Sequence, residues 1–212
     1  MNKLTYEEGI RYLLEVEPSF KKIIPKHEIS FFQRPKGFAG IISLVIEQQV
    51  SVQAAEAIKN KVKALMVNLS ADRIMELSTD KLRDVGLSRP KISYLKGIAM
   101  EEKNGKLNYS EVENMTDEDA REYLCQFKGI GKWTADCYLM ASLGRPDIWP
   151  ENDIGLQEGV RRLKDLKKRP TVEDMTSIAR KWRPFRSVAA NIIWADYDLS
   201  LIHISEPTRR TI

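Results

Sequence analysis

The sequence predicts an all-α protein, and three observations support this fold class. Apolar residues recur at spacings of three and four along nearly the whole chain, as they do on one face of a helix. Proline punctuates the gaps between the periodic segments, at Pro146, Pro150, Pro170 and Pro184. No segment alternates apolar and polar residues over more than a few positions, which is the pattern typical of a half-buried strand.

The predicted helices follow one another from the N-terminus. Tyr6, Ile10 and Leu13 form an apolar stripe, and Thr5 and Glu8 have the spacing of a capping box. The segment 38–49 is so apolar that we expect a buried helix there. The remaining helices are predicted at 52–67, 79–85, 91–103, 117–126, 132–143, 154–163, 172–181 and 185–196.

The C-terminal residues 200–212 do not continue this pattern. Helical periodicity ends abruptly after Leu199, and chain termini are often loosely packed. We therefore expect a folded unit over residues 1–199, followed by an irregular tail. Our hypothesis is that this tail is a non-native or frame-altered extension.

Composition and charge limit the function classes only partly. The 212 residues, 42% of them hydrophobic, can build one large domain or two small lobes that share a core. The net charge of +4 does not by itself indicate a nucleic-acid partner. Between Arg161 and Arg186, however, ten basic residues accompany three acidic ones, Asp165, Glu173 and Asp174. This basic segment either neutralises phosphates or forms a solvated helix face.

The sequence favours a protein of a reducing compartment. Cys125 and Cys137 are too few for a disulfide framework or a four-thiolate metal cluster. The N-terminus is polar, and no segment has the length of a membrane span. We expect an intracellular protein without metal or cofactor, located in the cytoplasm or nucleoid of a prokaryote or the nucleus of a eukaryote.

The most specific local motif is the segment from Phe127 to Ala135, FKGIGKWTA, between two predicted helices. A turn built on Gly129 and Gly131 bends tightly and leaves its backbone N–H groups accessible, while Ile130 tucks back between the helices. The N–H groups and the positive end of the following helix then point the same way, which suits a phosphate.

The turn has two interpretations, a phosphate-binding hairpin and an ordinary helix–turn–helix with a glycine cap. The residues around it distinguish between the two. Two glycines alone would favour that alternative. Lys128 and Lys132 flank the turn, and Thr134 follows it, which favours a hairpin that docks on the DNA backbone without reading its sequence.

About twenty residues further on, a proline-containing loop ends in Asp153. The carboxylate lies at the start of a predicted helix, where Asp is a good N-cap. Asp153 is therefore either a helix cap or a functional carboxylate.

Hairpin, loop and Asp153 together resemble the helix-hairpin-helix DNA glycosylase superfamily. Within it the sequence looks most similar to the DNA-3-methyladenine glycosylase II, or alkyladenine, branch. The hairpin, the segment Lys181–Ser187 followed by Trp194, and the segment from Phe38 to Ser51 are similar to motifs of this branch. The resemblance covers nearly the whole chain up to Leu199.

The resemblance implies a base-excision repair enzyme without strand-cleaving activity. Bifunctional members carry a lysine nucleophile at the position of Trp133, and a tryptophan cannot form the Schiff base that cleavage requires. Lys132 points about a hundred degrees away on the helix and is expected to contact phosphate. Asp153 would stabilise the oxocarbenium-like transition state and orient or deprotonate water. The expected substrates are alkylated purines such as 3-methyladenine and 7-methylguanine.

The resemblance also implies a base pocket and a wedge. Trp133 and Trp194 are the expected pocket walls, where an electron-rich ring attracts a cationic base, although either residue is also compatible with core packing. When the base leaves the duplex, a side chain fills the gap it leaves. Leu87 and Arg89, in a turn between helices, are the wedge candidates, with a plain loop as the alternative.

The implied architecture has two helical lobes with a DNA-binding cleft between them. One lobe comprises residues 37–143 and the other residues 1–36 and 144–199. The expected partner is double-stranded DNA that contains alkylated bases, bound by a monomer. Two alternatives are a non-catalytic helix-hairpin-helix DNA-binding module and a glycosylase for another damaged base.

Overall fold

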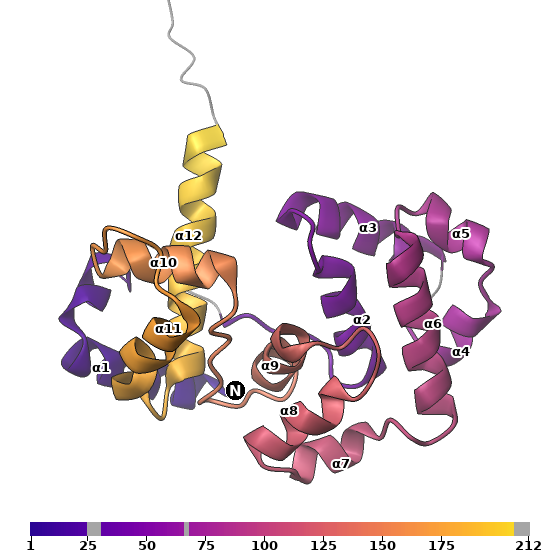
Figure 1. The fold of residues 1–212 in the computed structure, drawn as a ribbon, viewed down its shortest axis with the longest axis horizontal. Helices are drawn as coiled ribbons and strands as arrows, with labels where there is room; N and C mark the ends of the chain where they lie inside the picture. The colour runs from indigo at the N-terminus through magenta and orange to yellow at the C-terminus, as the bar shows by residue number, and fades with distance from the viewer. Residues whose placement is uncertain (25–30, 66–67, 206–212) are drawn as a thin grey trace, which may run out of the picture. The chain divides into compact units, whose positions relative to one another are not determined.

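The computed structural model describes residues 1–24, 31–65 and 68–205, with side chains up to Tyr197. Within these ranges the chain forms helices α1 to α12 and no strand, which confirms the predicted all-α class. The chain divides into two compact units (Figure 1): unit 1 comprises residues 1–32 and 144–212, and unit 2 comprises residues 33–143. No described helix has the length and apolar composition needed to cross a membrane.

Unit 2 is built around helix α2, whose apolar sequence explains its central place. Ile41, Ile42, Leu44 and Val45 of α2 are each fully buried. Helix α2 packs against α3, α6 and α9, and α6 also packs against α4 and α5 (Figure 1). The helices of unit 2 are α2 Phe38–Glu47, α3 Val52–Leu65, α4 Ala71–Glu76, α5 Thr79–Asp84, α6 Arg89–Lys103, α7 Tyr109–Asn114, α8 Asp117–Cys125 and α9 Lys132–Ala141.

Unit 1 is built around helix α12, which packs against α10 and α1 (Figure 1). Gly159 of α10 allows this approach, because a Cβ atom there would collide with the side chain of Ile193 on α12. Phe20, Trp149 and Trp182 form an aromatic cluster with edge-to-face ring contacts. The elements of unit 1 are α1 Lys3–Val16, the 3-10 turn Pro18–Lys22, α10 Ile154–Leu163, α11 Val172–Ala179, the 3-10 turn Arg180–Trp182 and α12 Arg186–Ser205.

Two sequence predictions about helix termini need correction. Helix α1 begins at Lys3 and is capped by Asn2, whose side chain accepts from the Thr5 N–H, so Thr5 is not its cap. Helix α12 continues to Ser205, so residues 200–205 are helical rather than irregular. The rest of the tail, 206–212, and the predicted helix end at Val67 lie outside the described residues.

The boundary between the units falls four residues before the predicted one, at Gln33 instead of residue 37. The reason is that the segment before α2 is bound to unit 2. The Arg34 N–H donates to the carbonyl of Ala141, and the Arg34 guanidinium pairs with Glu47 at 2.8 Å. Lys36 pairs with Glu113 at 2.9 Å. These are long-range contacts, which hydrophobic periodicity does not reveal.

The basic segment from Arg161 to Arg186 is partly neutralised within unit 1. Three carboxylates, Glu17, Asp147 and Glu158, each pair with two of its cations, and none of the three belongs to the acidic residues counted inside the segment. Lys167, Lys168, Arg169 and Arg180 are exposed. The pairs are Lys164 and Lys181 with Glu17, Arg183 and Arg186 with Asp147, and Arg161 and Arg162 with Glu158.

Candidate active site

The predicted hairpin is formed by α8, the turn 126–131 and α9. Gly129 has a φ of +99°, and a Cβ atom there would lie 2.5 Å from the Cβ of Tyr94, so only glycine fits this position. Ile130 is 2% exposed, and its N–H donates to the Phe127 carbonyl at 3.0 Å. The side chain of Ile130 thus holds the turn, as the sequence predicted.

Helix α9 begins directly after this turn. Gly131 is its N-cap residue, with extended backbone and no capping side chain. The backbone N–H groups of a helix's first turn have no partner within the helix, and the helix dipole places positive charge beside them. A phosphate-sized anion fits this arrangement. Lys132, the first residue of α9, is exposed.

Gln48 connects the hairpin to the end of α2. It was not among the site residues predicted from the sequence. Its Nε2 donates to the Gly129 carbonyl at 2.9 Å and to Thr134 Oγ1 at 2.8 Å. Thr134 is 1% exposed, so it supports the hairpin from inside and is not accessible to a phosphate, contrary to the sequence prediction. Arg121 and Asp136 form a further ion pair between α8 and α9.

An exposed loop follows Gln48. Gln49 has a φ of +53°, which is unusual for a residue other than glycine. Val50 and Val52 are 38% and 72% exposed, which places apolar side chains on the surface next to the hairpin's anchor. A strained backbone with exposed apolar residues is a signal of a functional loop, but backbone strain is not visible in the sequence.

The two wedge candidates differ in accessibility. Leu87 is 2% exposed and belongs to the core of unit 2, whereas Arg89, the first residue of α6, is exposed. Lys91, in the first turn of α6, is buried. Its Nζ donates to the Ile46 carbonyl at 2.6 Å in the interior, where burial lowers the pKa of the ammonium. Lys91 therefore caps the negative end of α2.

Asp153 lies in unit 1 and is the N-cap residue of α10. Its Oδ1 accepts a hydrogen bond from the Leu156 N–H at 2.5 Å, so the helix-capping alternative is structurally correct. The same Oδ1 accepts a second bond from Trp194 Nε1 at 2.9 Å. Asp153 and Trp194, two predicted site residues that are 41 positions apart, are thus brought together. Trp194 is half-buried, with its indole aimed at the carboxylate.

The loop that leads to Asp153 is fixed at its beginning by the first turn of α12. Ser187 is fully buried; its Oγ accepts from the Ile148 N–H at 2.9 Å and donates to the Arg145 carbonyl at 2.7 Å. Arg186 donates to both carboxylate oxygens of Asp147 at 2.7 and 2.9 Å. The backbone before the carboxylate is therefore held by side chains, not only by turn geometry.

The predicted site residues thus fall into two groups. Unit 1 holds Asp153 and Trp194 in direct contact, and unit 2 holds the hairpin residues, half-buried Trp133 at the start of α9, and Arg89. Across the described residues, no cluster of His, Cys, Asp and Glu has the arrangement of a metal site.

Comparison with proteins of known name identifies the family of the chain. The family model described as HhH-GPD superfamily base excision DNA repair protein matches residues 42–184. DNA-3-methyladenine glycosylase 1 of Schizosaccharomyces pombe is 33% identical over 174 residues, which cover 78% of this chain and 76% of that protein. Two Bacillus subtilis relatives, the second named DNA-3-methyladenine glycosylase, are 36% and 31% identical over 123 residues, and this chain spans only 43% and 41% of their lengths.

A solved structure agrees with the sequence comparisons. The 3-methyladenine DNA glycosylase Mag1 of Schizosaccharomyces pombe, in complex with abasic DNA, superposes with a TM-score of 0.81 at 29% identity. The match covers 88% of this chain and 95% of that chain. With the family model matching well over half of its residues, the chain belongs to the HhH-GPD superfamily of base excision DNA repair proteins.

Proposed function

We propose that this protein is a DNA glycosylase that hydrolyses the N-glycosidic bond of alkylated purines such as 3-methyladenine and 7-methylguanine in base excision repair. The observation that carries the proposal is the Asp153 carboxylate, whose Oδ1 accepts from Leu156 N–H and Trp194 Nε1. The two bonds fix the direction in which the carboxylate points. The names of the relatives supply the substrate class.

The charge of Asp153 fits the demands of the reaction. Loss of the base develops positive charge on the deoxyribose, and a fixed carboxylate close to C1′ stabilises that charge. The same carboxylate orients the attacking water or accepts its proton. An alkylated purine is already cationic and leaves readily, so no separate acid is needed to protonate the leaving base.

The base is rotated out of the duplex and received by aromatic side chains. Trp194 is suited to this role, because its Nε1–H bond to Asp153 fixes the ring next to the carboxylate. A cationic base stacked on an indole gains on the order of 0.5–2 kcal/mol from cation–π attraction. Trp133, half-buried on the first turn of α9, stays a predicted contact of the base.

The hairpin binds the DNA backbone, with N–H groups from Gly131 onward and the exposed Lys132 facing a phosphate. The wedge that fills the gap in the duplex belongs to an exposed residue. Arg89 meets this condition, and the loop after α2 offers Val50 as an apolar alternative.

The enzyme removes the base without cleaving the strand, because Trp133 stands where a Schiff-base lysine would act. It works as a monomer on double-stranded DNA that contains alkylated bases. Its location in the cell is that of the genome: cytoplasm or nucleoid in a prokaryote, nucleus in a eukaryote.

The test is release of 3-methyladenine and 7-methylguanine from methylated duplex DNA, measured before and after hot alkali. The proposal expects free base from the untreated reaction and strand breaks only after alkali. DNA binding without base release would instead favour a non-catalytic hairpin module, and strand breaks before alkali would refute the absence of lyase activity.

A further inference from the structure

One face of α12 carries three polar groups at helical spacing, Ser187, Asn191 and Trp194. Residues separated by four and seven positions lie above one another on a helix, so the three form a single stripe along two turns. Ser187 holds the start of the loop that leads to Asp153, and Trp194 donates to Asp153. Asn191, between them, has no part in the mechanism described so far.

Asn191 is 4% exposed, and both ends of its amide are hydrogen-bonded. Its Oδ1 accepts from the backbone N–H of Phe32 at 2.7 Å, and its Nδ2 donates to the hydroxyl of Tyr6 at 2.8 Å. Tyr6 in turn contacts the ring of Phe31, with 5.5 Å between the ring centroids. Asn191 therefore fixes the segment Phe31–Phe32 onto α12.

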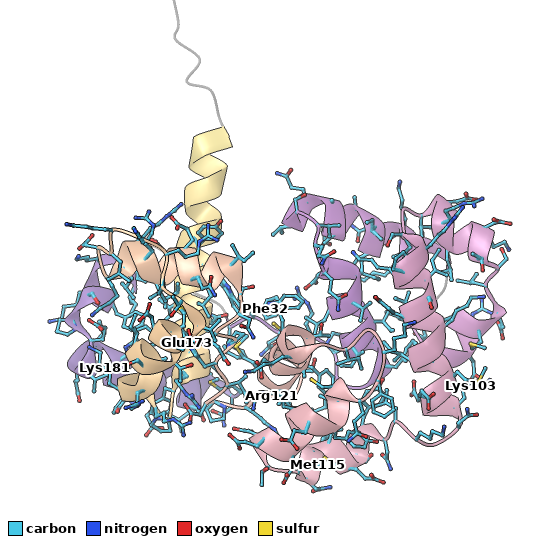
Figure 2. All side chains as sticks on the ribbon, in the orientation of Figure 1. Phe32, Lys103, Met115, Arg121, Glu173 and Lys181 are labelled. Carbon is cyan, nitrogen blue, oxygen red and sulfur yellow. The ribbon has the colours of Figure 1, made fainter. Side chains whose placement is uncertain are left out.

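Phe32 transmits this anchoring to the site. Its ring, labelled in Figure 2, meets Trp194 edge to face, with centroids 6.2 Å apart and an angle of 62° between the planes. The opposite constraint on the indole is the 2.9 Å bond from its Nε1 to Asp153. Trp194 is thus held between an aromatic edge, whose position Asn191 sets, and the carboxylate.

Burying an amide costs more free energy than burying an apolar side chain of similar size. A leucine at this position would gain apolar burial, whereas an amide must recover its lost hydration through bonds of good geometry. A buried polar group contributes directional bonds, which define where the groups around it lie. The bond that Asn191 accepts from the Phe32 N–H fixes the position of the Phe32 backbone.

We propose that Asn191 is a positioning residue for base release: through Phe32 it sets the Trp194 indole, and through Trp194 it orients the Asp153 carboxylate. Asn191 acts through these two side chains, so it is not itself a catalytic residue. This inference rests on the proposed glycosylase function for its effect on rate, but its structural link from Asn191 to Trp194 does not.

The first test is a double-mutant cycle measured as single-turnover base release. Asn191→Ala is expected to slow release by on the order of 10- to 100-fold without weakening DNA binding, because a small misplacement of a reacting group lowers the rate and not the affinity. Trp194→Phe removes the donor to Asp153. If Asn191 acts through Trp194, the double variant releases base no more slowly than Trp194→Phe alone. Effects that multiply would overturn the proposal.

A matched control separates positioning from a loss of stability. Val188 is fully buried on α12 and packs against α1 next to Gly9, and its apolar side chain takes no part in the hydrogen bonds of the polar stripe. Val188→Ala removes buried apolar atoms from the same helix, so it destabilises the unit but is expected to keep the wild-type rate. Equal slowing of Val188→Ala and Asn191→Ala at matched unfolding midpoints would reduce Asn191 to a structural residue.

The second readout does not depend on activity. In fluorotryptophan-labelled protein, the four tryptophans give separate fluorine NMR signals, and Trp194→Phe identifies the signal of Trp194. Asn191→Ala should shift or broaden this signal, and Val188→Ala should not. An unchanged Trp194 signal in Asn191→Ala would refute the link even if the protein released no base at all.

Should Asn191→Ala fail to fold, Phe32→Leu tests the next link of the same chain. It keeps the backbone N–H that Asn191 accepts and removes only the aromatic edge against Trp194. The expected result is the same slowing and the same shifted Trp194 signal. A wild-type rate and signal in Phe32→Leu would overturn the proposal.

Discussion

Two glycines of the hairpin, two residues apart, should respond differently to substitution by alanine: one substitution should lower stability and the other should weaken DNA binding. At Gly129, alanine would adopt a φ of +99° and place its Cβ atom 2.5 Å from that of Tyr94. Left-handed backbone costs about 1–2 kcal/mol and overpacking about 1–3 kcal/mol, so Gly129→Ala should destabilise unit 2 by about 2–5 kcal/mol.

At Gly131 the backbone is extended, and no atom lies within 4 Å of an added Cβ. Alanine there is a slightly poorer N-cap than glycine, so the folded state should lose only about 0.5–1 kcal/mol. Its methyl group would stand where a phosphate approaches the first turn of α9. Losing one charge-assisted hydrogen bond, worth about 1.5–3 kcal/mol, should weaken DNA binding by on the order of 10- to 100-fold.

The assay pairs urea unfolding with binding to an undamaged duplex at fixed ionic strength. Gly129→Ala should lower the unfolding midpoint by about 1 M or more, and Gly131→Ala should lower it by much less while weakening binding. The hairpin would not be the phosphate site if Gly131→Ala bound DNA as tightly as the wild type. A Gly129→Ala protein of full stability would refute the account of the turn.

Three further results are expected. Leu87→Ala should cost about 2–5 kcal/mol of stability, because the Leu87 side chain belongs to the core. Arg89→Ala should leave the unfolding curve unchanged and slow base release if Arg89 is the wedge. Unfolding curves and single-turnover rates of the two variants decide between these outcomes. Burial alone would raise the pKa of Glu17, but hydrogen bonds from Lys164, Lys181 and Ser19 outweigh it and lower the pKa from 4.5 to about 2. The ionised Glu17 therefore stabilises the fold by up to about 3 kcal/mol above pH 4.5. The stability difference between wild type and Glu17→Gln should shrink as the pH falls from 4.5 towards 2. A difference independent of pH would contradict this. Borohydride should trap no covalent complex of the wild-type enzyme with abasic DNA, and a trapped complex would reveal a Schiff-base lysine.

Most helices were predictable because each has an apolar stripe and an end signal. Helix α10 was predicted with its exact bounds, Ile154–Leu163, from such a stripe after Asp153. The six-residue helices α4 and α7 were missed, because so short a segment shows too few apolar positions to define a period. The capping of α1 was misassigned, since Asn2 and Thr5 are both good caps and only the backbone decides between them.

The site was predictable where a local motif carries it. The hairpin and Asp153 stand out because glycines, lysines and a carboxylate occur at recognisable spacings. The contacts that orient Asp153 were not predictable, since Trp194, Phe32 and Asn191 meet only through the packing of α12. The same holds for the basic segment: its charge is visible, but Glu17, which pairs with Lys164, is 147 residues away from it.

The most direct test of the central claim compares wild type with Asp153→Asn in single-turnover release of 3-methyladenine. Asparagine is as good an N-cap as aspartate, and its amide oxygen can still accept from the Leu156 N–H and Trp194 Nε1, so the helix is kept and only the charge is removed. The account predicts unchanged unfolding and DNA binding, with base release about 100- to 10,000-fold slower. Release at the wild-type rate would show that Asp153 only caps α10.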